Sequence, residues 1–238
     1  MTPQSLTALI DATWPAARLD RVGPWTIRAG AGGGSRVSAA TASAPAGADD
    51  IPAAEAAMRS LGQAPLFMVR PGEAALDAAL ATRGYRVKDP VTLYTAPVAD
   101  LAGPLPPVTC FRVWPPLAVQ RDIWTAGGIG PARLAIMARV AGPKTTILGR
   151  NGDSPAGTLF VARHAETAMV HAVAVPPRFR RRGMARSMMQ AAAVWSQEAG
   201  AQDLAVLVTT ANAAANALYA LLGMRAAAGY HYRIHPQA

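Results

Sequence analysis

The chain of 238 residues has one cysteine, few aromatic side chains and few charges. Cys110 is the only cysteine, so neither an intramolecular disulfide nor a cysteine-based zinc site can form. His164 and His171 have no metal-ligand companions at a suitable spacing. No run approaches the roughly 18 apolar residues of a membrane helix, and the first residues lack the basic segment of a secretory signal. We therefore expect a cytoplasmic protein with no metal and no membrane partner.

The sequence is rich in apolar residues and in positive charge. Hydrophobic residues make up 51% of the chain, many of them alanine, which indicates a folded core of small side chains on helices. Lysine and arginine outnumber aspartate and glutamate by 23 to 14, and the net charge of +9 favours anionic partners. Five arginines fall within nine residues: Arg178, Arg180, Arg181, Arg182 and Arg186.

In the first half, apolar periodicity predicts helices at 2–17, 51–62 and 73–83 and strands at 25–28, 36–41, 66–70 and 85–95. The glycine-rich segment 30–35 precedes a strand-like segment, so we interpret it as a hairpin turn and not as a phosphate loop. Five prolines and glycines between 97 and 107 break regular structure and indicate a linker. The predicted domains are 1–100 and 105–238.

The second half predicts a strand, two short helices and then three strands joined by hairpins, at 108–114, 117–124, 131–138, 145–150, 157–163 and 168–175. A helix, a strand, a helix and a final strand follow at 183–199, 204–208, 211–222 and 230–234. Three hairpin strands that lead into a βαβ unit predict an α/β (α+β) fold. Its central sheet is mixed but mostly antiparallel, with helices on its flanks.

The arginine-rich segment connects a predicted strand to the start of the long helix. The first amides of a helix have no partner within the helix, and the helix dipole adds partial positive charge there, so this position suits a phosphate or pyrophosphate. Gly183 and Ala185 leave room for an anion to approach. An exposed arginine-rich turn and a nucleic-acid patch are the alternatives.

The spacing Arg180-x-x-Gly183-x-Ala185 resembles the R/Q-x-x-G-x-G/A signature of the GNAT superfamily of N-acetyltransferases. The resemblance implies that this loop binds the pyrophosphate of CoA through Arg180, Arg181, Arg182, Gly183, Met184, Ala185 and Arg186. It also implies that the preceding strand offers backbone groups to the pantetheine arm of CoA at Val173, Ala174 and Val175.

A second motif lies about 30 residues further on. The stretch from Asn212 to Met224 resembles the GNAT pattern N-x-x-A-x-x-L-Y-x-x-x-G-F, with methionine in place of phenylalanine. Asn212, Asn216 and Tyr219 are spaced to share one helix face. By resemblance, both asparagines belong to the cofactor site, and Tyr219 donates a proton to the departing CoA thiolate as the general acid. A tyrosine that only packs at a helix end is the alternative.

An amine acceptor arrives protonated, so a group must remove a proton before the amine attacks the thioester. The candidates are Glu166, His171 and His231. His171 precedes Val173 by two residues, which predicts that both lie on one strand face, and a histidine titrates near neutrality. We therefore take His171 as the candidate base, with a half-buried strand histidine as the alternative.

The first half echoes the second in its order of elements, and residues 76–85 faintly echo 216–224. We therefore expect a tandem of two GNAT-like halves, the first degenerate and closing one wall of the substrate pocket. An unrelated α+β extension is the alternative.

The resemblance implies transfer of an acetyl group from acetyl-CoA, as cosubstrate, to a primary amine of a small molecule or peptide. The other possibilities are a non-catalytic acyl-CoA-binding or regulatory module and a nucleic-acid-binding protein that uses the Arg178–Arg186 cluster. The sequence does not indicate the oligomeric state.

Overall fold

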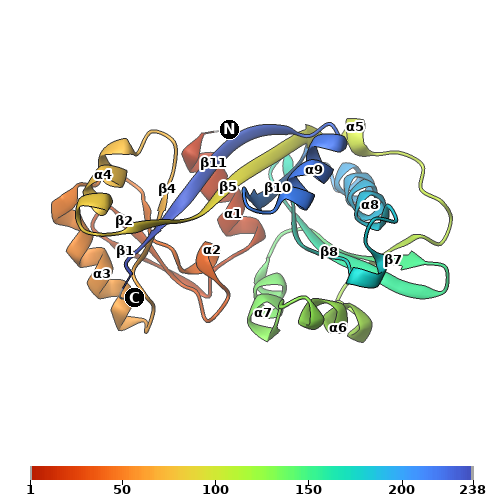
Figure 1. Cartoon of the computed structure of the whole chain (residues 1–238), viewed down its shortest axis with the longest axis horizontal. Coiled ribbons are helices and arrows are strands. Elements are labelled where there is room, and N and C mark those ends of the chain that lie inside the picture. Colours follow the sequence, from red (N-terminus) through yellow and green to blue (C-terminus); the bar gives the residue numbers. More distant parts are fainter. Residues whose placement is uncertain (1, 237–238) are drawn as a thin grey trace.

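The computed structural model describes residues 2–236, which form two halves that share a sheet (Figure 1). The first half contains α1 (Pro3–Thr13), β1 (Arg18–Val22), β2 (Trp25–Ala29), α2 (Ser35–Ser38), β3 (Thr41–Ala42), η1 (Ala48–Asp50), α3 (Ile51–Ser60), β4 (Leu66–Val69), α4 (Ala74–Thr82) and β5 (Arg86–Pro97). The second half follows α5 (Val98–Leu101) and contains β6 (Cys110–Val113), α6 (Ala118–Ala126), α7 (Pro131–Arg139), β7 (Lys144–Asn151), β8 (Ser154–His164), β9 (Thr167–Ala174), η2 (Pro177–Phe179), α8 (Met184–Glu198), β10 (Asp203–Thr209), α9 (Ala213–Leu221) and β11 (Arg225–Ile234). None of the described helices is long and apolar enough to cross a membrane.

Eight strands form the main sheet, in the order β4-β11-β5-β10-β9-β8-β7-β6. All neighbours are antiparallel except β9 and β10, which run parallel. A three-stranded sheet, β1-β2-β3, belongs to the first half. A parallel bridge between Ala40 and Phe67 connects this smaller sheet to β4. The expected mixed, mostly antiparallel sheet is therefore confirmed.

The two halves repeat one order of elements. Three strands, a helix, a strand, a helix and a last strand occur as β1-β2-β3-α3-β4-α4-β5 and again as β7-β8-β9-α8-β10-α9-β11. The third and fourth strands of the second series pair in parallel, and in the first series a single parallel bridge joins Ala40, just before β3, to Phe67 of β4. The last strands are exchanged, because β5 pairs with β10 of the second half and β11 pairs with β4 of the first. Figure 1 shows β5 and β11 as two long ribbons that join the halves, which fits the expected tandem arrangement.

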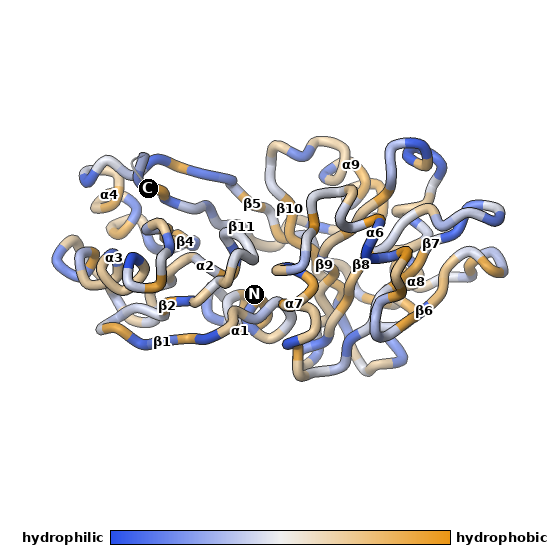
Figure 2. The backbone as a smooth tube through the Cα atoms, turned by 90° about the horizontal axis from the view of Figure 1, so that it is seen from below, coloured by the Kyte–Doolittle hydropathy of each residue, from blue (hydrophilic) through white to orange (hydrophobic). Residues whose placement is uncertain are grey.

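Helices cover both faces of the second half. On one face α8 packs against β7 and β8, where two glycines leave the sheet without side chains. A Cβ at Gly149 would lie 2.3 Å from the sulfur of Met184, and one at Gly157 would lie 2.8 Å from Cε of Met188. The other face is covered by α6, α7 and the end of α1, with Trp14 and Trp124 buried there. Figure 2 shows the hydrophobic residues gathered on β8, β9 and their neighbours between these layers.

Two expectations for the glycine-rich segment are wrong. Residues 36–41 were expected to be a strand, but Gly34 (φ +95) leads the chain into α2, and only Thr41 enters β3. Segment 30–35 is therefore not a hairpin turn. Its glycines allow α7 to approach, because a Cβ at Gly33 would lie 2.5 Å from Cδ1 of Ile136.

Two strands differ from expectation. The sequence pattern did not indicate β1, because exposed charged residues occupy much of it. β11 begins at Arg225 and not near Tyr230, because the alanines that follow Arg225 show no alternation of polar and apolar residues. The other predicted helices and strands occur close to their expected positions.

One carboxylate fastens the exchanged strand β11 to the first half. Asp77 of α4 accepts hydrogen bonds from His231 Nε2 at 2.7 Å and from Arg233, whose Nε and Nη2 lie 2.7 and 2.9 Å away. The hydrogen bond from Arg233 is the main cause that lowers the pKa of Asp77 from 3.8 to about 2. This contribution to stability is therefore complete above the ordinary pKa and disappears as the pH falls through the folded value.

We expect Asp77→Asn to lower the free energy of unfolding by roughly 1–3 kcal/mol at pH 7, because Arg233 and His231 lose a charged partner. The difference from the unsubstituted protein should shrink as the pH falls from about 4 to about 2, where Asp77 itself takes up a proton. Urea denaturation at several pH values measures both effects. Asp20→Asn, which removes the exposed partner of Arg18, is the control and should have a small effect. Equal losses for the two variants would contradict the assignment.

Candidate functional site

The parallel strands β9 and β10 of the main sheet separate before they end. Pairing of β9 with β10 runs from Thr167–Asp203 to Val170–Val206, yet β9 continues to Ala174 and β10 to Thr209. Between the diverging ends lies a cavity of about 780 Å³. Backbone groups at a strand edge are strong hydrogen-bonding groups that need partners. An extended ligand can therefore lie along the free edge of β9.

A β-bulge lies beside this edge. Phe160 of β8 pairs with His171 and Thr158 pairs with Ala174, so β9 contains one extra residue there, and Ala172 has a φ of +53. The fully buried Trp124 of α6 donates from Nε1 to the carbonyl oxygen of Ala172 at 2.7 Å. This hydrogen bond connects α6 to the bulge where the cavity is lined by β9.

The bulge corrects the expectation that His171 and Val173 share a strand face. His171 stacks on Trp14, with ring centroids 4.8 Å apart, and lies against Phe160. Val173 packs instead against the core cluster on the opposite face, which includes Met188. The extra residue shifts the alternation of side chains by one position.

The arginine-rich loop closes one end of the cavity. Phe179 and Met184 are buried and anchor the loop on both sides of its exposed arginines. Gly183 adopts a left-handed conformation (φ +79) as the N-cap of α8, and nothing lies within 4 Å of a Cβ built there. The free amides at the start of α8 are therefore accessible to an anion.

The predicted site residues divide into two groups. Those that line the cavity are His171, Val173, Ala174, Val175, Arg180, Ala185, Asn212 and Tyr219. Those that do not line it are Arg181, Arg182, Gly183, Met184, Arg186 and Asn216. Arg180 also donates from Nε to the carbonyl oxygen of Val175 at 3.1 Å, which holds its guanidinium at the end of β9.

The two asparagines shape the turn between β10 and α9. Asn212 is the N-cap of α9 and accepts from the amide of Ala215 at 3.1 Å. Asn216 donates from Nδ2 to the carbonyl oxygens of Thr209 at 3.0 Å and Asn212 at 2.7 Å. Their side-chain amides therefore stabilise the start of the helix that carries Tyr219.

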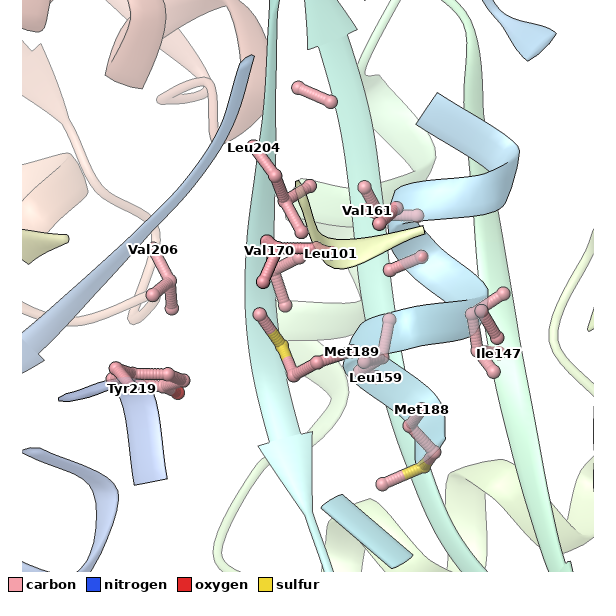
Figure 3. Close-up of a cluster of buried hydrophobic side chains, with 14 of the residues drawn as sticks. Leu101, Ile147, Leu159, Val161, Val170, Met188, Met189, Leu204, Val206 and Tyr219 are labelled. Carbon is pink, nitrogen blue, oxygen red and sulfur yellow. The ribbon is translucent and has the colours of Figure 1, made fainter. Parts of the chain in front are cut away.

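Tyr219 projects from α9 toward the opening between β9 and β10. Its side chain is 4% exposed, its ring lies 5.7 Å from that of Tyr94, and it lines the cavity. Figure 3 shows its hydroxyl end directed toward the strand that carries Val170. Burial raises the pKa of Tyr219 to about 12, and no described residue hydrogen-bonds to its hydroxyl. At neutral pH the phenol is therefore protonated and able to donate to a ligand.

His171 lies in a chain of hydrogen bonds that uses both of its ring nitrogens. Arg36 of α2 donates from Nη1 to Nδ1 at 3.0 Å, so Nε2 carries the proton and donates to Thr13 Oγ1 at 3.0 Å. The hydroxyl of Thr13 in turn donates to the carbonyl oxygen of Leu9 at 2.7 Å. Burial, and then the charge of Arg36, hold the pKa of His171 well below its usual range. The ring is therefore neutral and both nitrogens have partners.

Sequence reasoning missed Arg36, Arg133 and Trp124. Arg36 and Arg133 line the cavity, and Trp124 positions the bulge. Arg36 is 135 residues from His171 in the chain, so no local motif connects the two. Among residues 2–236 no group of three or more histidine, cysteine, aspartate or glutamate side chains is arranged to hold a metal ion.

The chain is similar to known acetyltransferases. The model of the acetyltransferase (GNAT) family matches residues 112–224. The GCN5-related N-acetyltransferase from Kribbella flavida has a TM-score of 0.71 at 17% identity, over 98% of this chain and 95% of that chain. The corresponding protein from Sphaerobacter thermophilus has a TM-score of 0.59 at 14% identity, over 77% and 65%. A tandem GNAT protein from the clavulanic acid biosynthesis pathway has a TM-score of 0.54 at 14% identity, over 76% and 66%. At these identities the structures show a shared fold, and no curated protein sequence matches the chain.

We expect Trp124→Phe to lower the free energy of unfolding by about 1–3 kcal/mol, because the buried carbonyl of Ala172 loses its donor. Urea denaturation measures the change. Trp195→Phe is the matched control, since no described residue accepts a hydrogen bond from the partly buried indole of Trp195. If both substitutions cost the same, the hydrogen bond to Ala172 does not hold the bulge.

Proposed function

We propose, on the match of residues 112–224 to the acetyltransferase (GNAT) family, that the chain transfers an acetyl group from acetyl-CoA to a primary amine. One observation carries the proposal. The free edge of β9, the start of α8 with Arg180, and the hydroxyl of Tyr219 all meet one cavity. Residues 105–238 are the proposed catalytic domain, and residues 1–100 complete its sheet through β5 and its cavity through Arg36.

CoA would lie across the opening between the two strands. Its pyrophosphate would bind the free amides at the start of α8, together with Arg180, where the helix dipole favours negative charge. The pantetheine arm would add to the edge of β9 from Val173 to Val175, as an extra strand would. Arg181, Arg182 and Arg186 are exposed around this end and would attract the phosphates at longer range.

The reaction needs two proton movements. The nitrogen of the neutral amine would attack the thioester carbonyl, the C–S bond would break, and the proton of Tyr219 would pass to the departing thiolate. The N–H proton that the new amide must lose would then return to the oxygen of Tyr219. The pKa of Tyr219, about 12, lies above that of an ordinary thiol, near 8.5. Since burial also disfavours the charged thiolate, the two groups remain close enough for a strong hydrogen bond.

The amine must lose a proton before it attacks, and His171 is poorly arranged to accept it. Its Nδ1 already accepts from Arg36, so His171 is free to act only after Arg36 moves away. His231 pairs with Asp77, and Glu166 accepts from Gln202, and neither lines the cavity. We therefore propose that water in the cavity accepts the proton of the amine and that His171 positions Arg36.

Acetyl-CoA should bind the full chain and raise its melting temperature. Arg180→Gln should weaken binding roughly 10-fold, because a charged hydrogen bond is worth about 1.5–3 kcal/mol. Arg182→Gln is the matched control and should have a smaller effect, since Arg182 does not line the cavity. Calorimetry measures both affinities. Absence of binding, or a stabilisation by duplex DNA that acetyl-CoA does not produce, would reject the cofactor assignment in favour of a nucleic-acid partner.

Tyr219→Phe should reduce kcat by about 10²-fold or more, the usual scale for general acid catalysis, with acetyl-CoA affinity unchanged. Release of CoA thiol with a competent amine measures the rate. Because the pKa of Tyr219 is about 12, its hydroxyl stays protonated through pH 10, so Tyr219 should cause no loss of rate below that pH. An unchanged kcat in the variant would reject the acid role. Acetyl-CoA binding without transfer to any amine would favour a non-catalytic acyl-CoA-binding module.

A further inference from the structure

The cavity continues past the bulge into a second hollow of about 260 Å³ that lies between the two halves. Arg36, Ile129, Arg133 and Ala172 line both spaces, so they form one continuous cleft. The second hollow is walled by β5 and β11, by α7 and by the glycine-rich segment of the first half. No residue of the arginine-rich loop lines it, so it lies away from the proposed phosphate site.

Two guanidinium groups in this hollow have no carboxylate partner among residues 2–236. Arg36 is half-buried, its Nη1 contacts the neutral His171, and its Nε is buried without a hydrogen-bond partner among the described residues. Arg133 is exposed, its guanidinium makes no ion pair or hydrogen bond with the part of the chain from 2 to 236, and its Nη2 lies 3.5 Å from a Cβ built on Gly34.

The buried arginines elsewhere in the first half are neutralised. Arg28 forms an ion pair with Asp11 at 2.7 Å, and Arg70 forms one with Glu73. A desolvated charge is costly unless an opposite charge or a full set of hydrogen bonds compensates it. Arg36 therefore lacks the carboxylate partner that Arg28 and Arg70 have. Within the described part of the chain Arg139 and Arg163 of the second half lack one too, but they do not line this hollow.

Tyr230 and Asp89 are further polar residues of the hollow: the first is a hydrogen-bond donor and the second is a carboxylate. The hydroxyl of Tyr232 donates to that of Tyr230 at 3.3 Å, which leaves the proton of Tyr230 free for a ligand. Asp89 also lines the hollow, but it is exposed and forms no ion pair with either arginine. The hollow therefore has one guanidinium held by His171, a second that is exposed and without an ion pair, and a phenol donor, against one exposed carboxylate. This arrangement suits an anion, with Asp89 as a partner for an ammonium group.

We propose that this hollow binds an anionic group of the acceptor amine, a carboxylate or a phosphate, through Arg36 and Arg133. The inference rests on the proposed function and names the acceptor class. Guanidinium forks bind both oxyanions in a bidentate manner. The small volume suits an acceptor of about the size of an amino acid, and the two cations disfavour an acceptor with a second ammonium group.

His171 is the positioning residue of this site. As a neutral ring it accepts from Arg36, while Thr13 fixes its other nitrogen, so the guanidinium has one orientation. An imidazolium has no acceptor and would repel Arg36. The N-terminal half thus supplies Arg36 and Thr13, and the second half supplies Arg133 and His171.

The first test compares matched amines with the full-length protein at saturating acetyl-CoA. Free amino acids are assayed against their carboxamides, and phosphoethanolamine against ethanolamine, by release of CoA thiol. We expect kcat/KM at least 10-fold higher for the carboxylate or the phosphate member, equivalent to about 1.4 kcal/mol. The pair that shows the difference identifies which oxyanion binds. Equal rates within pairs would overturn the proposal, as would acetyl-CoA binding without turnover of any anionic amine.

The second test uses Arg36→Gln and Arg133→Gln, with Arg21→Gln as a control that removes a positive charge from exposed β1. Each of the first two should raise KM for the anionic acceptor about 10-fold and leave acetyl-CoA affinity unchanged. KM for the matched neutral amine should stay the same, and the control should change nothing. His171→Gln, which keeps an acceptor, should retain more of the preference for the anionic member than His171→Leu. If Arg36→Gln instead weakens acetyl-CoA, or selectively weakens succinyl-CoA, the arginine contacts the donor and the proposal is wrong. Failure of acetyl-CoA to bind the unsubstituted protein would reject the proposed function itself.

Discussion

The pairing of β5 with β10 and of β11 with β4 is the constraint on which the rest of the structure depends. β10 needs a partner on the edge that faces away from β9, and β5 provides it over the whole length of β10. Because β10 is held on that side, it can separate from β9 beyond Val206 without losing its place in the sheet. The same exchange fixes the two halves against each other, so that α1 and α2 pack on β8, β9 and α7.

Small residues and buried polar bonds make that packing possible. Glycines at 33, 149 and 157 let side chains of α7 and α8 approach the backbone more closely than any Cβ would allow. Trp124 satisfies the carbonyl that the bulge at Ala172 turns out of the ladder. At the interface of the halves, His171 remains neutral because it is buried beside Arg36, and a neutral ring is the form that can accept from a guanidinium. Stability and the shape of the cleft therefore depend on the same contacts.

The parts of the site that could be predicted from the sequence depend on residues that are close together in the chain. The start of a helix after a strand, with Gly183 and Ala185, is a property of consecutive residues, and it correctly placed an open helix N-terminus beside Arg180. The spacing of Asn212 and Tyr219 likewise placed both on the cavity. The arginines could not be ranked from the sequence, since what distinguishes Arg180 is its hydrogen bond to Val175 and its place on the cavity wall. The face of His171 was misjudged because a bulge leaves no mark in the alternation of residues.

By itself, the sequence determined the elements of the second half, the mixed sheet and the open helix start at Gly183. These follow from periodicity, turn residues and helix-end amides, which act over a few residues. Only the tertiary structure decided that β5 and β11 are exchanged, that the segment 30–35 admits α7, and that Arg36 reaches His171 across 135 residues. Such contacts depend on how sheets and helices stack, and nothing in the spacing of nearby residues records them.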